Sequence, residues 1–476
     1  MRSLLANSLA MLAARLIVPA LSFAINVGIA RLCGPEVLGG YVHLLALAAI
    51  FQTAAAAGLT SLLTRELAAH PEDAAALLRR ARTLGAMTGL LATAGFVATA
   101  ALVTSADRLI PAALLATSIL PSAWIAVQES FFMASRTHHR ITLVALVENA
   151  LKLGLAVATF HSGGGLALLC AGVAAARVAA LVFGGLLVSR AGVRASWRPV
   201  PLAETAGFAR AVAPFAVLLV LSMTYFKLDV LLVEALLGPG PTGVYGAALA
   251  LYSVALLVPE SVMGAVYPRL AARHRESSQA YAQATRVAVR LVTAGLVPLA
   301  LGLICFADVL LRVAYGGRYA EAAPVLRLLA ASLPLHAANG ALGQALQAGR
   351  LQGPMVRIVF AGLGAHAALC ALLVPRLGIT GAPIAILASS LVVTVGAALV
   401  FHREVSPLVP APAGLLATAC IVGPIALTLA APAGWTYIAG AVGLLALAAA
   451  ARGLLITEDD RTALRQAMRP TRLGPA

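Results

Sequence analysis

The chain has 476 residues, of which 61% are hydrophobic and 11% are charged, and its formal net charge is +16. A soluble domain averages about 45–50% apolar and about 25% charged residues, so this composition excludes an ordinary soluble protein. The five cysteines are scattered and form no CxxC pair, which argues against a disulfide framework or a structural zinc site. No metal or cofactor is therefore expected, and the positive charge does not by itself indicate a nucleic-acid partner.

Long apolar runs follow one another along the chain, and a membrane-spanning helix needs about 20 mostly apolar residues. These runs predict an all-α polytopic membrane protein with about 14 transmembrane helices. The first run, from Leu9 to Ala30, is too long for the core of a removable signal peptide and is interpreted as the first span. The predicted spans are 9–31, 37–63, 83–104, 110–134, 141–160, 166–189, 209–237, 244–267, 286–313, 322–346, 355–374, 382–401, 413–431 and 435–452.

The arginines predict the orientation, because cytoplasmic loops carry an excess of Lys and Arg. With the N-terminus in the cytoplasm, 20 arginines fall in inner segments, and 4 fall in outer loops, namely Arg31, Arg108, Arg318 and Arg376. This asymmetry predicts an even number of spans, with both termini cytoplasmic.

The largest loop predicts where the chain divides. Residues 191–208 are basic and contain prolines, and they are interpreted as a cytoplasmic linker. They separate an N-lobe, residues 1–190 with spans 1–6, from a C-lobe, residues 209–402 with spans 7–12. Residues 403–456 are interpreted as two additional spans, and residues 457–476 as a basic cytoplasmic tail. Two interpretations stay open for the tail, which either lies on anionic membrane lipids or is solvated and kept inside by topology alone.

One short loop occurs twice, as "RLCGPEVLGGYV" at 31–42 and as "ALLGPGPTGVYG" at 235–246. Six spans separate the copies, and because six is even, the two lobes are predicted to be parallel repeats with the same orientation. Parallel repeats of this kind build transporters that bind their cargo between the halves and alternate its access to the two sides. The matching positions, each 204 residues apart, are Gly34 and Gly238, Pro35 and Pro239, Gly39 and Gly243, and Tyr41 and Tyr245.

Ionisable side chains inside the predicted spans need a partner or water, because each costs at least about 2.5–3.5 kcal/mol at the bilayer centre. Glu148 and Lys152 in the fifth span are four residues apart on one helix face, in the favourable order. Two interpretations stay open for them. The pair neutralises itself in place, or it lines a polar cavity where an anionic cargo competes for the lysine.

The seventh span carries Lys227 and Asp229, which are two residues apart and so lie on different faces of the helix. Asp229 is either a structural partner for a base on a neighbouring helix or a carboxylate that couples transport to an ion. Glu129, Glu260 and Arg357 are further candidates in their spans. The lone histidines His43, His336 and His366 are predicted to be hydrogen-bonded packing residues rather than proton relays.

Four segments resemble the polysaccharide flippase family of the multidrug/oligosaccharidyl-lipid/polysaccharide exporter superfamily. They are "NSLAMLAARLIVPALSFAINVGIARLCGPEVLGGYV", "FKLDVLLVEALLGPGPTGVYGAALAL", "AAPVLRLLAASLP" and "PRLGITGAPIAIL". The resemblance covers nearly the whole chain. It implies two six-helix lobes with two appended helices, in the cell inner membrane. It also implies a cargo, a glycan on an undecaprenyl pyrophosphate carrier that is moved from the cytoplasmic to the periplasmic leaflet.

The resemblance also suggests roles for particular residues. The family's cavity often has a base in the first helix, which favours Arg15 as a contact of the pyrophosphate headgroup, and Asp229 matches the aspartate of the family's "FxxD" pattern. Arginine forks match phosphate oxygens in geometry. The predicted site residues are Arg15, Lys152, Lys227 and Arg357 for substrate binding, and Asp229, Glu148 and Glu260 for coupling to a proton or sodium ion.

Two other functions were weighed against the flippase. A cation-coupled multidrug or small-molecule efflux transporter of the same superfamily is the main alternative. A membrane enzyme such as a glycan polymerase needs a sizeable outer loop with catalytic groups, and this sequence has neither such a loop nor a nucleophile or phosphate-loop motif. The chain is therefore not expected to be an enzyme, although a glycan polymerase is an expected partner.

Overall fold

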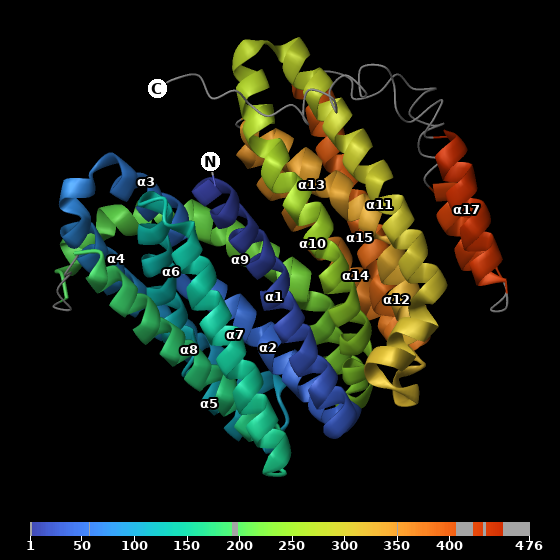
Figure 1. Ribbon diagram of the computed structural model, residues 1–476, viewed down its shortest axis with the longest axis horizontal. Helices are drawn as coiled ribbons and strands as arrows, with labels where there is room; N and C mark the ends of the chain where they lie inside the picture. Colours follow the sequence, from blue (N-terminus) through green and yellow to red (C-terminus); the bar gives the residue numbers. More distant parts are fainter. Residues whose placement is uncertain are drawn as a thin grey trace. The chain divides into compact units, whose positions relative to one another are not determined.

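The structure is a computed structural model that describes residues 2–56, 58–192, 199–349, 351–405, 422–431 and 435–450. Within these ranges every regular element is a helix (Figure 1), which confirms the predicted all-α class. The chain forms two compact units, Met1–Ala250 and Leu251–Ala476. The boundary lies inside helix α10 (Pro239–Glu276), so the first compact unit holds α10's first turns as well as the helices before it. The lobes proposed at 1–190 and 209–402 stay a prediction.

Unit 1 is built from nine helices and the start of α10, with two short 3-10 turns, η1 (Pro71–Asp73) and η2 (Ala106–Arg108), in the residues that the structure describes. The helices are α1 (Arg2–Leu32), α2 (Gly34–Ala56), α3 (Leu59–Ala69), α4 (Ala74–Val103), α5 (Leu109–Ala116), α6 (Ile119–Ala134), α7 (His138–His161), α8 (Leu166–Arg190) and α9 (Leu202–Leu237).

The helices of unit 1 place α7 and α8 beside the chain's first two spans. Helix α7 packs against α1 on one side and α8 on the other, while α2 packs against α4, α6 and α9. Apolar side chains from α3, α4, α6 and α8 form one buried core, which includes Leu63, Leu78, Phe132 and Val188. The polar side chains of α7 and α8 are thus held between tightly packed apolar helices.

Two predicted spans of unit 1 are each made of two helices. The second span divides into α2 and α3, where Gly58 has a φ of 66°, a left-handed backbone conformation that favours glycine. The fourth span divides into α5 and α6. The same happens in the tenth span, which consists of α12 (Ala322–Ala331) and α13 (Leu333–Ala348). Apolar length predicted these spans correctly, but it did not show where the helices break.

Unit 2 continues from α10 through α11 (Ser278–Tyr315), α12 and α13 to α14 (Gln352–Leu377), α15 (Gly381–Glu404) and α17 (Thr436–Ala450). Helix α11 packs against α12 and α13, and α14 packs against α15. Helix α17 contacts α11, where the Cys305 thiol donates a hydrogen bond of 3.4 Å to the Thr436 carbonyl. Most of the predicted span 413–431 and the whole tail 457–476 lie outside the described residues, although 422–430 are helical.

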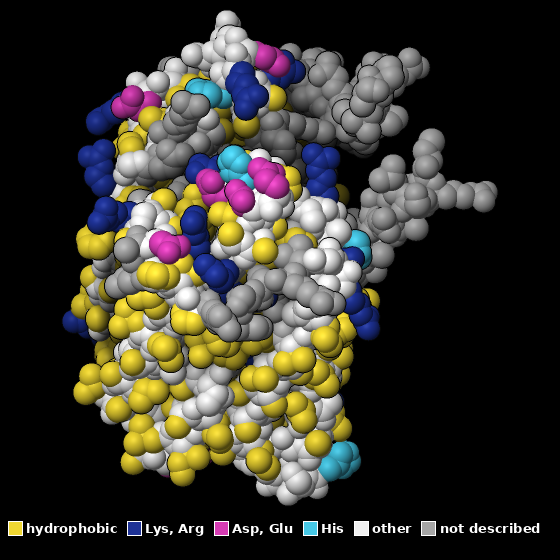
Figure 2. Space-filling view, turned by 90° about the vertical axis from the view of Figure 1, so that its left-hand side faces the viewer, with side chains coloured by type: hydrophobic (Ala, Val, Ile, Leu, Met, Phe, Trp, Pro, Cys, Tyr) yellow, Lys and Arg dark blue, Asp and Glu magenta, His cyan; other side chains and the backbone are white. Residues whose placement is uncertain are grey.

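The apolar helices make this a multi-pass membrane protein. Ten stretches of the described chain are long and apolar enough to cross a membrane, and one of them, Gly353–Glu404, contains both α14 and α15. Shorter apolar helical stretches at Ile17–Leu32 and Thr436–Leu445 belong to α1 and α17. Figure 2 shows charged side chains gathered toward one end of the viewed face, above a wide band of hydrophobic side chains. A total of about 14 spans is consistent with this arrangement.

Candidate functional site

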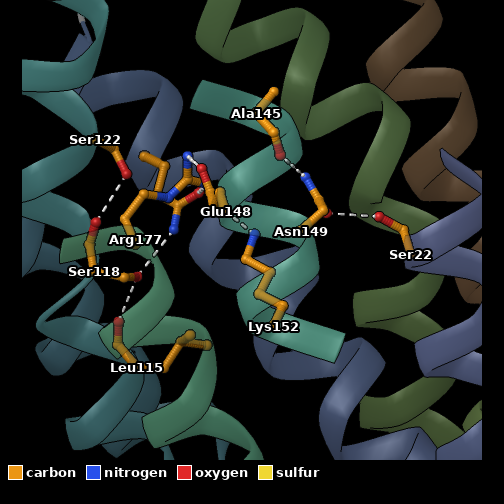
Figure 3. A network of polar contacts seen from close by, with 10 residues as sticks. Ser22, Leu115, Ser118, Ser122, Ala145, Glu148, Asn149, Lys152 and Arg177 are labelled. Carbon is orange, nitrogen blue, oxygen red and sulfur yellow. Dashed lines mark hydrogen bonds and ion pairs between the residues drawn. The ribbon is translucent and has the colours of Figure 1, made fainter. Parts of the chain in front are cut away.

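A cluster of charged side chains lies inside unit 1, between α7 and α8. Glu148 on α7 is buried, and its carboxylate contacts two bases at once (Figure 3). Its Oε1 lies 2.5 Å from the Lys152 ammonium, one turn further along α7, and its Oε2 lies 3.2 Å from Nη1 of Arg177 on α8. The pairing of Glu148 with Lys152 was predicted from their spacing. The second base was not.

Arg177 extends the cluster toward α2 and α5. Its Nη2 lies 3.4 Å from Oε1 of Gln52 on α2. The amide of Gln52 in turn donates a 3.0 Å hydrogen bond to Oγ of Ser118, at the junction of α5 and α6. The Arg177 Nε is buried and has no hydrogen-bond partner among the described residues. Arg177 is therefore held by one carboxylate and one amide oxygen, with part of its donor capacity unused.

A neutral contact ties α7 to α1 beside the charges. Ser22 on α1 donates a 3.0 Å hydrogen bond to Oδ1 of Asn149, and the Asn149 amide donates a 2.8 Å bond to the Ala145 carbonyl. Asn149 is buried next to Glu148. This contact fixes the rotation of α7 against α1, and with it the direction in which the Glu148 and Lys152 side chains project.

The cluster contains as many carboxyl groups as basic groups. Glu129 on α6 is half-buried and lies within electrostatic reach of both Arg177 and Glu148, so two bases face two carboxylates. Charges inside a low-dielectric region are stable only when they are paired and hydrogen-bonded. A carboxylate that holds a lysine and an arginine together occupies the kind of position that a phosphate group can take, because both bases are common phosphate ligands.

The other predicted site residues of unit 1 lie apart from the contacts of this cluster. Arg15 lies on α1, but its side chain is outside the described part of the structure. Lys227 is half-buried on α9. Asp229 is 2% exposed, and its Oδ2 accepts a hydrogen bond from the hydroxyl of Tyr245 on α10, while its Oδ1 has no partner among the described residues.

The predicted site residues of unit 2 are more exposed than those of unit 1 that the structure describes. Glu260 on α10 and Arg357 on α14 are both exposed in the structure. No ion pair or hydrogen bond joins either of them to another described residue. Nothing in the geometry of unit 2 therefore assembles these two side chains into a common site.

Two features of unit 1 were missed or misjudged from the sequence. Arg177 lies in the middle of an apolar span, and an ionisable residue there is by default a functional candidate, so its position was the signal that should have singled it out. His43 was predicted to be hydrogen-bonded, but neither of its ring nitrogens has a hydrogen-bond partner in the described chain. His366 behaves as predicted, with Nδ1 3.1 Å from the Ser389 hydroxyl.

The chain shares its fold with solved structures of membrane proteins, among them a lipid II flippase and two transporters of the MOP superfamily. A sequence profile described as "Polysaccharide biosynthesis protein" matches residues 29–324, more than half of the chain. The protein therefore belongs to the polysaccharide biosynthesis protein family, in agreement with the resemblance seen in the sequence. No curated protein sequence matches the chain.

Three solved structures illustrate the likeness. The lipid II flippase MurJ in an inward closed conformation has a TM-score of 0.72 and 14% identity, covering 97% of this chain and 99% of its own. An inward-facing multidrug resistance transporter of the MATE family has a TM-score of 0.68 and 14% identity, covering 83% and 98%. A MOP superfamily transporter from Pyrococcus furiosus has a TM-score of 0.59 and 13% identity, covering 84% and 96%. At these identities the likeness is one of fold.

Proposed function

We propose that this protein is a flippase that moves an undecaprenyl-pyrophosphate-linked oligosaccharide from the cytoplasmic to the periplasmic leaflet of the inner membrane, for cell-surface polysaccharide synthesis. Membership of a polysaccharide biosynthesis family and the MurJ-like fold both support this proposal. The observation that carries it is the pairing of Lys152 and Arg177 on one buried carboxylate within membrane-spanning helices. A polyanionic headgroup that crosses an apolar layer needs such bases along its path.

The proposed binding step is an exchange of anions. Pyrophosphate oxygens displace the Glu148 carboxylate from Arg177 and Lys152, and the freed carboxylate then takes a proton or turns toward water. Arg177 is suited to this step because its Nε has no hydrogen-bond partner among the described residues and its hydrogen bond to Gln52 is long. We propose Arg15, Lys227 and Arg357 as further bases along the path of the headgroup.

Coupling to an ion gradient is part of the same proposal. Asp229, Glu148 and Glu260 are the carboxylates proposed to bind a proton or sodium ion during the cycle. Asp229 is the best placed of them, since one oxygen accepts the Tyr245 hydroxyl and the other has no partner in the described chain. Reconstituted vesicles test this role. If transport by Asp229→Asn depends on the ion gradient as strongly as wild-type transport does, Asp229 does not couple transport to the ion.

Deletion of the gene in its own host tests the function directly. We expect surface polysaccharide to disappear and the carrier-linked oligosaccharide to accumulate on the cytoplasmic side, with wild-type protein restoring export. Lys152→Gln, Arg177→Gln and Arg15→Ala should fail to restore it while still accumulating in the membrane. Arg65→Gln is the matched control, because this arginine is exposed and its ion pair among the described residues is with its neighbour Glu66.

A cation-coupled efflux transporter is the second candidate, favoured by the similarity to the MATE structure and by the buried Asp229. The same deletion strain separates the two functions. Unchanged surface polysaccharide together with increased sensitivity to cationic dyes would replace the flippase by the efflux transporter. Both termini are proposed to be cytoplasmic, which protease protection of terminal tags would check.

A further inference from the structure

The two copies of the repeated loop contact each other directly in unit 1. A methyl group added to Gly39 would overlap the backbone carbonyl of Pro239, and one added to Gly243 would overlap that of Pro35. These four residues form two pairs that are 204 positions apart, so the contact is reciprocal. Each turn itself begins with a glycine in the same conformation, with φ of 85° at Gly34 and 84° at Gly238. The repeat thus joins the starts of α2 and α10 backbone to backbone.

A largely buried ion pair lies at the same end of unit 1. Arg108, in the turn before α5, contacts the Glu234 carboxylate in the last turns of α9, and the two side chains are only 13% and 9% exposed. Arg108 also lies 3.6 Å from Asp107, whose carboxylate is exposed. The distribution of arginines predicts that this end faces the outside. The ion pair therefore connects the outer turn between the third and fourth predicted spans with the outer end of the seventh.

A third ionisable group completes the cluster. His43 on α2 is 2% exposed and lies within electrostatic reach of both Glu234 and Arg108. Both ring nitrogens of His43 and Oε2 of Glu234 are buried without a hydrogen-bond partner in the described chain. Buried polar atoms are almost always paired, so three such atoms in one place need an explanation.

If the only role of this contact were to hold α9 against α5, apolar side chains would stabilise it at least as well as an ion pair. Burying an ion pair costs desolvation free energy that its attraction often fails to recover, and apolar replacements are frequently neutral or stabilising. Charges that separate into water regain their hydration, so such a pair is suited to a contact that must both form and break. The unpaired atoms fit this view, since they are polar groups that can take new partners when the ion pair separates.

We propose that Arg108 and Glu234, with His43 beside them, form an outer latch that holds the start of α2, the turn before α5 and the end of α9 together, and that opens when the cargo leaves. The contact of Gly39 and Gly243 lets the two turns pack closely, and the ion pair can separate and form again. The inference rests on the proposed transport function for its purpose, but the opening itself can be measured without any transport assay.

Spin-label distances test the opening. Ile110 on α5 and Leu236 on α9 are both exposed and lie two residues from Arg108 and Glu234. With the five native cysteines replaced, nitroxides at Ile110→Cys and Leu236→Cys should report one main distance in the otherwise unchanged protein in vesicles. Glu234→Gln should add a second population at longer distance, because it leaves Arg108 buried without its counter-charge.

The control is Glu276→Gln, which removes a carboxylate from the exposed Arg273–Glu276 pair and should leave the distribution unchanged. Should Glu234→Gln fail to accumulate, the double variant Arg108→Gln/Glu234→Gln carries the same measurement with no buried charge left unpaired. A single distance, identical with and without the latch charges, would overturn the latch.

A reversible tether tests whether opening is needed for transport. In Arg108→Cys/Glu234→Cys, a bifunctional thiol reagent with a cleavable disulfide should stop glycan export, and a reductant should restore it to its level before bridging. A merely structural contact predicts the opposite, since a tether replaces the lost ion pair. If the protein still exports glycan while the two cysteines are bridged, the latch is overturned and the proposed function is not. If the deletion strain keeps its surface glycan, the proposed cargo is overturned, and the distance measurement still tests the latch.

Discussion

The two compact units differ in where they carry charge. Among the Asp, Glu, Lys and Arg side chains that the structure describes, only Glu148 and Asp229 are fully buried, and both lie in unit 1. The buried hydrogen bonds described in unit 2 include those of His366 with Ser389 and of Tyr252 with Ser332. Its ion pair between Arg327 and Asp308 is partly exposed.

This difference separates two uses of polar groups in a membrane protein. Neutral hydrogen bonds between helices stabilise packing at a modest gain of about 0.6 to 2 kcal/mol each. Buried charges are costly and are kept where ions or charged cargo are handled. We infer that unit 1 carries most of the charge chemistry of transport, with Glu260 and Arg357 as the proposed contribution of unit 2, and that the neutral hydrogen bonds of unit 2 serve helix packing. Substitutions in both units can test this.

The largest effect is expected at Glu148. Glu148→Gln leaves Lys152 and Arg177 facing each other without a full counter-charge, and breaking a buried pair in this way costs about 3–5 kcal/mol. We expect the free energy of unfolding in detergent to fall by this amount, and glycan export to fall at least tenfold. Glu276→Gln, at an exposed pair in unit 2, should change stability by no more than about 1 kcal/mol. Equal losses in the two variants would contradict the comparison.

The next largest effect is expected at the reciprocal glycines. Gly39→Ala forces its methyl group onto the Pro239 carbonyl, and overpacking against a backbone that cannot yield costs about 1–3 kcal/mol. Gly240→Ala is the control in the adjacent turn, because a Cβ there meets nothing within 4 Å. Thermal unfolding of the two variants in the same detergent measures the difference. Equal melting temperatures would show that the close contact between the two turns does not contribute to stability.

A smaller effect is expected where α1 meets α7. A double-mutant cycle of Ser22→Ala and Asn149→Ala should give a coupling free energy of about 0.5–1.5 kcal/mol for their hydrogen bond. Asn149→Ala should also reduce export by more than its stability loss explains, since the side chains of Glu148 and Lys152 depend on the orientation of α7. If export falls only in proportion to the amount of folded protein, the role of Asn149 is confined to helix packing.

The smallest effect is expected in unit 2. The Thr394 hydroxyl donates to Oδ1 of Asn339 at 2.5 Å and to the Ser390 carbonyl. Thr394→Val keeps the shape and removes this bond, at a cost of about 1 kcal/mol, and export per folded molecule should not change. A well-folded Thr394→Val protein that no longer exports glycan would show that this neutral hydrogen bond of unit 2 takes part in transport and does not serve packing alone.

The apolar runs of the sequence predicted the fold well, because membrane spans are set by length and hydropathy alone. Breaks such as that at Gly58 escaped this reasoning, since they depend on backbone conformation within a continuous apolar run. The chain also divides inside α10 because α9 packs against α2, a tertiary contact with no local signature.

The candidate site was predictable only where its members share a helix. Glu148 and Lys152 are one turn apart, so their spacing showed the pair. Arg177 and Gln52 come from other helices, and pairing them requires knowing which faces of α2, α7 and α8 meet. The ion pair of Arg108 and Glu234 could not be seen in the sequence for the same reason, since the partners are 126 positions apart.

The reciprocal contact of the repeated turns limits how far the two halves of the protein can diverge. Gly39 has room only while Pro239 keeps its backbone path, and Gly243 depends in the same way on Pro35. A substitution in one copy is therefore felt in the other, 204 positions away. Each turn is part of the surface against which the other packs, so a side chain larger than hydrogen at Gly39 or Gly243 requires the backbone of the opposite turn to move.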